Sequence, residues 1–151
     1  MITLNAAAPS FEAQATDGTT VKLSDFRGKP LVLYFFPRVF TPGCTRQADQ
    51  FEESLPEITA LGARVMGVST DDHKTQCEFS AARKLTFPIV SDADGAIARR
   101  FDVIWPLMKV AQRVTFIIDA DGVIRAIFHH ELRVGLHVRS VLQALKALKA
   151  A

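Results

Sequence analysis

The sequence contains little cysteine: Cys44 and Cys77 are the only two in 151 residues. Two cysteines are too few for a scaffold held by disulfides, and in a reducing compartment they are more often redox-active or metal-binding than structural. Long apolar runs are also missing, because none reaches the roughly 18 residues that a membrane span needs. The first residues lack the basic start and apolar stretch of a signal peptide. We therefore expect a cytoplasmic protein with no membrane partner.

The chain also lacks an excess of either charge. Its 18 basic and 16 acidic residues give a formal net charge of +2, and the basic residues are scattered. A nucleic-acid surface gathers Lys and Arg on one face beside stacking aromatics, whereas the aromatic residues of this chain lie in strand-like runs. We expect no nucleic-acid partner. Because 48% of the residues are apolar and no repeat or linker interrupts them, residues 1–151 are expected to form one domain.

A recognisable metal-ligand pattern is absent as well. The nearest approach to one consists of His129, His130, Glu131 and His137. The adjacent histidines alternate across the end of an expected strand, and no Cys-x-x-Cys accompanies them. We expect neither a metal ion nor another cofactor.

Apolar runs and turn signals alternate along the chain in an order that predicts an α/β fold. An N-terminal hairpin is expected over residues 11–23, with Asp17-Gly18 in its turn. The expected strands are residues 30–36, 64–69, about 87–90, 114–119 and 123–128. The expected helices run from about 44 to 60, from 71 or 72 to 84, from 93 to 101, and onward from about 137. This order favours a thioredoxin-like fold, with a mixed central β-sheet flanked by helices and an N-terminal β-hairpin.

Cys44 is the most informative residue, because it follows an apolar strand and falls at the start of a helix. Thr41 suits the N-cap and Pro42 the first helical position, which places Cys44 in the first turn. The thiolate is the nucleophile, and an ordinary thiol of pKa ~8.5 is only about 3% ionised at pH 7. The helix dipole favours the anion by roughly 0.3–1 kcal/mol, which is too little by itself to ionise most of the thiol at pH 7. A nearby cation is therefore expected, and Arg113 is the candidate.

The chain resembles a peroxiredoxin of the bacterioferritin-comigratory-protein branch. The segments that carry this resemblance span nearly the whole length: residues 8–11, 33–37, 40–45, 67–71, 87–88, 91–92 and 113–119. The resemblance implies a thiol peroxidase that reduces hydrogen peroxide and small organic hydroperoxides through a sulfenic acid at Cys44. It further implies a thioredoxin-type reductant as partner, and we expect a monomer or a weak dimer.

The same resemblance assigns roles around Cys44. Arg113 corresponds to the family's invariant arginine, whose guanidinium stabilises the thiolate and the peroxide oxygens. Thr41 supplies a hydroxyl to this network, and Pro37 shields the sulfur from water. Two simpler interpretations remain open, in which Arg113 is a surface residue at a strand entry and Thr41 only caps the helix. Gln47, one turn after Cys44, is expected to support these residues without contacting the reacting atoms.

Cys77 is where the sequence departs from the branch. Many members carry a resolving cysteine five residues after the peroxidatic one, where this chain has Asp49. Another subset carries it on the next helix, at the position of Ser80. We expect Cys77 to lie on the polar face of that helix, opposite an apolar stripe of Phe79, Ala82 and Leu85. Cys77 is thus either the resolving cysteine or a bystander in a one-cysteine mechanism.

Two other functions are possible alternatives to peroxide reduction. A thiol-disulfide oxidoreductase needs Cys-x-x-Cys, but Thr41 occupies the first position of that pattern, and Val114 stands where a thioredoxin has its active-site proline. A non-catalytic holdase or redox-sensing protein needs an exposed apolar patch. Only the segment from Ile104 to Val110 offers such a patch, and it covers either the pocket or a partner surface.

Overall fold

A five-stranded mixed sheet forms the centre of the molecule. The computed structural model describes residues 2–129 and 134–150. The strand order is β5-β4-β3-β6-β7; β3 pairs in parallel with β4 and β4 with β5, while β3–β6 and β6–β7 are antiparallel. Their bounds are Leu31–Phe35 for β3, Arg64–Ser69 for β4, Ile89–Ser91 for β5, Val114–Ile118 for β6 and Ile124–His129 for β7.

One face of the sheet is covered by N-terminal elements and a short helix. These are the hairpin of β1 (Glu12–Gln14) and β2 (Thr20–Lys22), the 3-10 helix η1 (Leu23–Phe26) and α3 (Ala96–Arg100). Successive side chains of a strand point to opposite faces, and on β3 it is Leu31, Leu33 and Phe35 that enter the core on this side.

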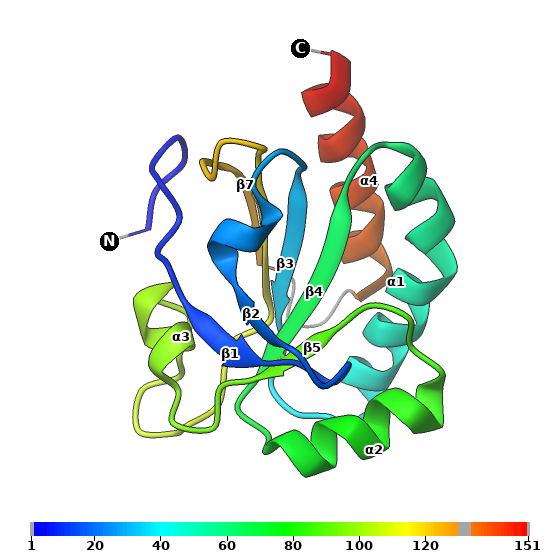
Figure 1. Cartoon of the computed structure of the whole chain (residues 1–151). Helices are drawn as coiled ribbons and strands as arrows, with labels where there is room; N and C mark the ends of the chain where they lie inside the picture. Colours follow the sequence, from blue (N-terminus) through cyan, green and yellow to red (C-terminus); the bar gives the residue numbers. More distant parts are fainter. Residues whose placement is uncertain (1, 130–133, 151) are drawn as a thin grey trace.

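The other face of the sheet carries the longer helices. Figure 1 shows α1 (Pro42–Ala60) and α4 (Val134–Ala150) side by side, with α2 (His73–Arg83) crossing the end of the sheet. The alternate residues of β3, Val32 and Tyr34, join the core under these helices. Among the described residues, none of the helices combines the length and apolar content that a membrane crossing requires.

The predicted fold is confirmed, with shifts at several short elements. Strand β5 begins two residues later than expected, α3 is a shorter helix, α4 begins at Val134 rather than near His137, and η1 was not predicted. Short elements carry little periodicity of their own. Their ends are set by tertiary bonds, as at β5, where Thr16 of the hairpin exchanges hydrogen bonds with Ile89.

Candidate active site

Cys44 lies in the first turn of α1, at the point where the chain returns from β3. Strand β3 ends at Phe35, a six-residue connection over residues 36–41 follows, and α1 begins at Pro42. The thiol is almost fully buried, with 1% of the residue exposed, and packs in the apolar cluster that contains Tyr34 and Val39. Pro37, half-buried, is the second residue of this connection. The predicted position of Cys44 in the first turn of a helix is therefore confirmed, and its sulfur is held in a mostly apolar setting.

Arg113 supplies the cation that the sequence required. It precedes β6, and the antiparallel register sets its neighbour Val114 opposite Phe35, so Arg113 reaches the edge where β3 ends. Only 6% of Arg113 is exposed. Its Nη2 donates to the sulfur of Cys44 at 3.4 Å. A guanidinium in this position favours the thiolate and offers donors to negative oxygen, and the interpretation of Arg113 as a surface residue is wrong.

Two further residues of α1 position the guanidinium. The fully buried Gln47 lies one helical turn after Cys44, and its Oε1 accepts a hydrogen bond from Nη1 of Arg113 at 2.5 Å. Gly43 provides the space, because a Cβ there would lie 3.1 Å from Nη2. Gln47 thus supports Arg113, as expected, while the tight fit at Gly43 was not predicted.

Thr41 occupies the N-cap position of α1 but does not cap it with its side chain. Its backbone is extended, as an N-cap requires. In the described part of the chain, however, no helix N–H donates to its hydroxyl, which itself donates to the carbonyl oxygen of Arg38 at 2.8 Å. The predicted capping bond is wrong, because the hydroxyl is directed to the carbonyl oxygen of Arg38 instead of to the N–H groups of the helix. This bond also orients the hydroxyl, and its role toward peroxide stays a prediction.

The connection before Cys44 is anchored by the carboxylate of Asp71, to which the sequence assigned no role at the site. Oδ2 of Asp71 accepts from the backbone N–H of Val39 at 2.9 Å and from the hydroxyl of Ser69 at 2.7 Å. Phe40 adopts a left-handed φ of 64°, and its ring packs edge-on against Phe79 of α2 at 5.2 Å. The parallel pairing of β3 and β4 brings their carboxyl ends together, and this adjacency is the signal that could have identified Asp71.

Tyr34 remains protonated beside this site. Burial raises the pKa of its hydroxyl well above the ordinary value; the charge of Cys44 adds to this rise and Arg113 opposes it. The phenol therefore keeps its proton at neutral pH. A neutral ring contributes apolar packing around the sulfur, stacking with Phe36 and Phe51.

Cys77 is not brought to Cys44, and both thiols are free. Cys77 lies on α2, half-buried rather than on an exposed face. Its sulfur lies 3.5 Å from Nε2 of His73 and 4.0 Å from the carbonyl oxygen of Thr16 in the hairpin. Residues 77 and 79 are about 200° apart around a helix. Because Phe79 packs on the connection before Cys44, the sulfur of Cys77 points away from it.

The apolar stripe predicted for α2 is also partly wrong. Phe79 is buried, but Ala82 is exposed and the buried position next to Cys77 is Gln76. The amide nitrogen of Gln76 donates to the hydroxyl of Ser69 and to the carbonyl oxygen of Val90. A buried amide is tolerated where its donors are satisfied, and hydrophobic periodicity alone does not find such a position.

The segment from Ile104 to Val110 forms a projecting hairpin-like loop. Ile104 pairs with Ala111, and the N–H of Trp105 donates to the carbonyl oxygen of Val110. Its tip is exposed, with Leu107 fully so. The segment thus offers an exposed apolar surface.

The expectation about metal falls partly outside the described residues. His130 and Glu131 are not among them, and nothing is described of the side chain of His137. Within residues 2–129 and 134–150, no group of three or more His, Cys, Asp or Glu side chains is arranged to hold a metal ion.

Comparison with known proteins agrees with this geometry. The sequence profile of the AhpC/TSA family matches residues 4–127. Chloroplastic peroxiredoxin Q of Oryza sativa subsp. japonica is 34% identical, covering 97% of this chain and 68% of that protein. Peroxiredoxin Bcp of Bacillus subtilis (strain 168) is 38% identical, covering 96% of each.

Solved structures give the same result. Peroxidoxin BcpB from Mycobacterium tuberculosis superposes with a TM-score of 0.91 at 31% identity, covering 97% of this chain and 98% of that one. Peroxiredoxin Q of Xanthomonas campestris superposes with a TM-score of 0.86 at 35% identity, covering 92% of this chain and 91% of that one.

Proposed function

Because the chain belongs to the AhpC/TSA family and is similar to peroxiredoxins over nearly its whole length, we propose that it reduces hydrogen peroxide and small organic hydroperoxides at Cys44. The observation that carries the proposal is the 3.4 Å contact between the buried guanidinium of Arg113 and the sulfur of Cys44. A bacterioferritin comigratory protein of Xanthomonas campestris is described by its alkyl peroxide reduction activity, and this supports the inclusion of organic hydroperoxides among the substrates.

The first half of the cycle is a nucleophilic displacement on oxygen. The thiolate of Cys44 attacks one peroxide oxygen, the O–O bond breaks, and the sulfur becomes a sulfenic acid. The leaving oxygen carries away the electron pair and takes a proton to become water or an alcohol. Arg113 offers donors to this developing charge, Thr41 offers its hydroxyl, and Pro37 limits the access of water to the sulfur.

The second half regenerates the thiol. We assign Cys77 as the resolving cysteine: its thiol attacks the sulfenic sulfur, a disulfide forms and water leaves. A thioredoxin-type dithiol then reduces the disulfide by exchange. A disulfide needs Cα atoms within about 7 Å, so Cys77 must first leave its contacts with the N-terminal hairpin. We propose that the chain acts in the cytoplasm; a bacterial relative supports this location, whereas the plant relatives are chloroplastic.

One observation favours a second candidate cycle. The sulfur of Cys77 points away from the Cys44 connection, which suits a one-cysteine peroxidase whose sulfenic acid is reduced directly by an external thiol. The chemistry at Cys44 is the same in both cycles. A thiol-disulfide oxidoreductase is disfavoured, since Thr41 stands where its other cysteine would be.

Intact mass after one equivalent of peroxide tests the proposal. The native protein is expected to lose two hydrogens, as a disulfide does, whereas Cys77→Ser should gain one oxygen. Cys44→Ser should consume no peroxide, because every step begins at that sulfur. If Cys44→Ser kept the native rate, the peroxidase assignment would be wrong. A gain of one oxygen by the native protein would instead support the one-cysteine cycle.

A further inference from the structure

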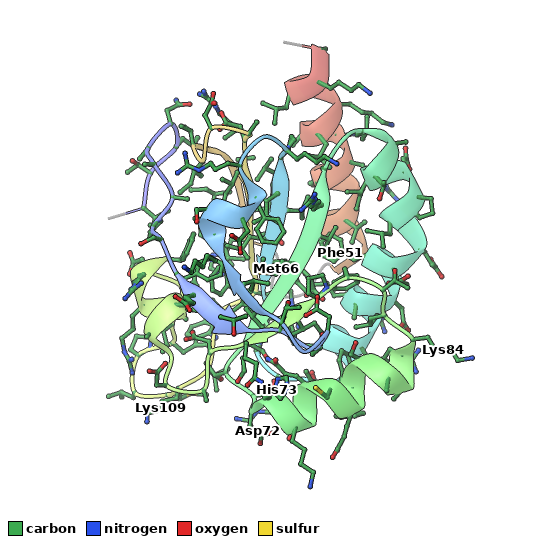
Figure 2. The ribbon with its side chains drawn as sticks, viewed as in Figure 1. Phe51, Met66, Asp72, His73, Lys84 and Lys109 are labelled. Carbon is green, nitrogen blue, oxygen red and sulfur yellow. The ribbon has the colours of Figure 1, made fainter. Side chains whose placement is uncertain are left out.

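Cys77 has a histidine as its nearest polar partner. His73 begins α2 and precedes Cys77 by one helical turn, so the helix itself sets their side chains on one face. Both nitrogens of the imidazole lie near the sulfur, Nε2 at 3.5 Å and Nδ1 at 4.0 Å. Figure 2 shows His73 at the N-terminal end of α2, beside Asp72.

The resolving step requires a proton acceptor at this place. A thiol attacks a sulfenic acid as the thiolate, so the proton of Cys77 must leave its sulfur. The second neighbour, the carbonyl oxygen of Thr16 at 4.0 Å, can orient the S–H but cannot remove the proton. An imidazole accepts and releases protons between about pH 5 and 8. The ring of His73 is half-buried and therefore keeps contact with water for this exchange.

We propose that His73 is the general base of the resolving step. The proton of Cys77 passes to a ring nitrogen of His73 as the sulfur attacks the sulfenic sulfur of Cys44. The S–O bond breaks, the S–S bond forms, and the leaving hydroxide takes the proton from His73 to become water. The net change is one sulfenic acid and one thiol to one disulfide and one water. His73 lies only four residues before Cys77, and so it travels with Cys77 when α2 opens.

None of the other charged side chains described near Cys77 and His73 is placed to accept the proton of Cys77. Asp72 accepts the N–H of Thr75 as the N-cap of α2. In the hairpin, Asp17 follows Thr16, and its carboxylate accepts two bonds from Thr19. On α2 itself, Lys74 and Glu78 are exposed. Each of these side chains is thus bonded elsewhere or directed to solvent.

Alkylation of Cys77 isolates the effect of His73 from peroxide chemistry. In the Cys44→Ser background only Cys77 reacts with iodoacetamide. His73→Gln is expected to slow this reaction about tenfold at pH 6.5–7.5. This factor is below the range typical of general-base catalysis, because the thiol is alkylated while α2 is still closed and not in the opened form that reacts with Cys44. The rates should converge near pH 10, where solvent hydroxide removes the proton. Lys74→Gln, which removes an exposed charge one residue away, should match the parent.

Single turnover then tests the role in resolution, which rests on the proposed function. With Cys44 present, His73→Gln should form sulfenic acid at the native rate and the disulfide about tenfold more slowly, as followed by quenched intact mass. If the native protein formed no disulfide, the resolving role of Cys77 would fail and His73 with it. A disulfide formed at the native rate in His73→Gln, with alkylation unchanged across pH, would overturn the inference about His73 alone.

Discussion

At the scale of single residues, the site depends on one guanidinium held from two sides. Gln47 accepts from one terminal nitrogen of Arg113 and Cys44 from the other. Gly43 lies so close that a methyl group there would press on Nη2 of Arg113, the nitrogen that contacts Cys44. Because the position of the charge is fixed before peroxide arrives, little reorganisation is needed during the reaction.

Arg113→Ala should therefore slow sulfenic-acid formation by on the order of 10² to 10³, the usual cost of removing a preorganised donor to developing charge. Stopped-flow kinetics of peroxide consumption measures this rate. Arg46→Ala is the matched control, since that arginine lies two residues after Cys44 but is exposed. Equal rates for the two variants would show that the contact of Arg113 with the sulfur does not contribute to the reaction.

Sequence reasoning at this scale found the residues that belong to a continuous motif and missed those that act across strands. Cys44 is recognisable because a buried strand, a Thr-Pro-Gly approach and a helix start occur together. Asp71 is not, because its partner Val39 is distant in sequence and the bond depends on how β3 and β4 are aligned. His73 contacts a sulfur only through the helix that carries both, and an isolated histidine gives no periodic signal.

At the scale of elements, two side chains of α1 hold the last residue of α2 and the segment that follows it. Nε and Nη2 of Arg83 both donate to the carboxylate of Asp49, the first at 3.0 Å. One turn later, both oxygens of Glu52 accept from Thr86, one from its N–H and one from its hydroxyl, each at 2.7 Å. Asp49 occupies the position that carries the resolving thiol in many relatives. In this chain that position joins the two helices instead.

Opening of α2 should thus be limited by this attachment. Arg83→Gln is expected to speed disulfide formation by about threefold, a small factor because exposed ion pairs contribute little. Hydrogen exchange of amides in α2 should quicken with it, since segments with weak attachments open more often. Lys74→Gln removes the same charge from α2 outside the attachment and serves as control. Unchanged exchange in Arg83→Gln would mean that opening starts at the other end of α2.

The elements themselves differ in how well the sequence predicted them. Strand β4 was placed at its observed bounds, and β3 and α1 to within one or two residues, because long apolar periods and turn residues mark them. Strand β5 was shifted and helix α3 is shorter than expected, since a strand of three residues and a helix of five are too short to show a clear period. Helix α3 begins where the carboxylate of Asp92 accepts the N–H groups of Ile97 and Ala98, a bond that no local pattern shows.

At the scale of the whole molecule, the N-terminal segment is tied to the turn between β6 and β7. The N–H of Asn5 donates to the carbonyl oxygen of Ile124, and Ile124 donates back to Ala6. Arg125 joins the two regions, donating to Asn5 and, from its Nε, to the carboxylate of Asp119 at 2.7 Å. Residues more than a hundred positions apart thus close the fold.

Asp119 makes this closure dependent on pH. Burial raises the pKa of its carboxyl, but the N–H groups of Val123 and Asp121 and the guanidinium of Arg125 outweigh burial, and the net pKa lies below the ordinary value. A lowered pKa in the folded state stabilises the fold above the unfolded-state pKa of about 4. That stability is lost as pH falls through the folded-state value.

Urea unfolding between pH 7 and pH 3 tests this dependence. Asp119→Asn should be less stable than the native protein at pH 7, and the difference in the free energy of unfolding should shrink as the pH falls below about 4. The shrinkage follows because the native carboxyl becomes protonated while the amide does not titrate. A difference that stayed constant from pH 7 to pH 3 would show that the ionised form of Asp119 does not stabilise the fold.

The direction in which Cys77 points also affects the competition between two reactions of Cys44 after its oxidation. Once formed, the sulfenic acid has two fates: capture by a thiol, or attack on a second peroxide to give sulfinic acid, which ordinary thiols do not reverse. In the proposed two-cysteine cycle, capture by Cys77 requires α2 to open, and its rate does not depend on peroxide, whereas further oxidation speeds up in proportion to peroxide concentration. In that cycle, the packing of α2 against the N-terminal hairpin and α1 determines the dose of peroxide at which the protein inactivates itself.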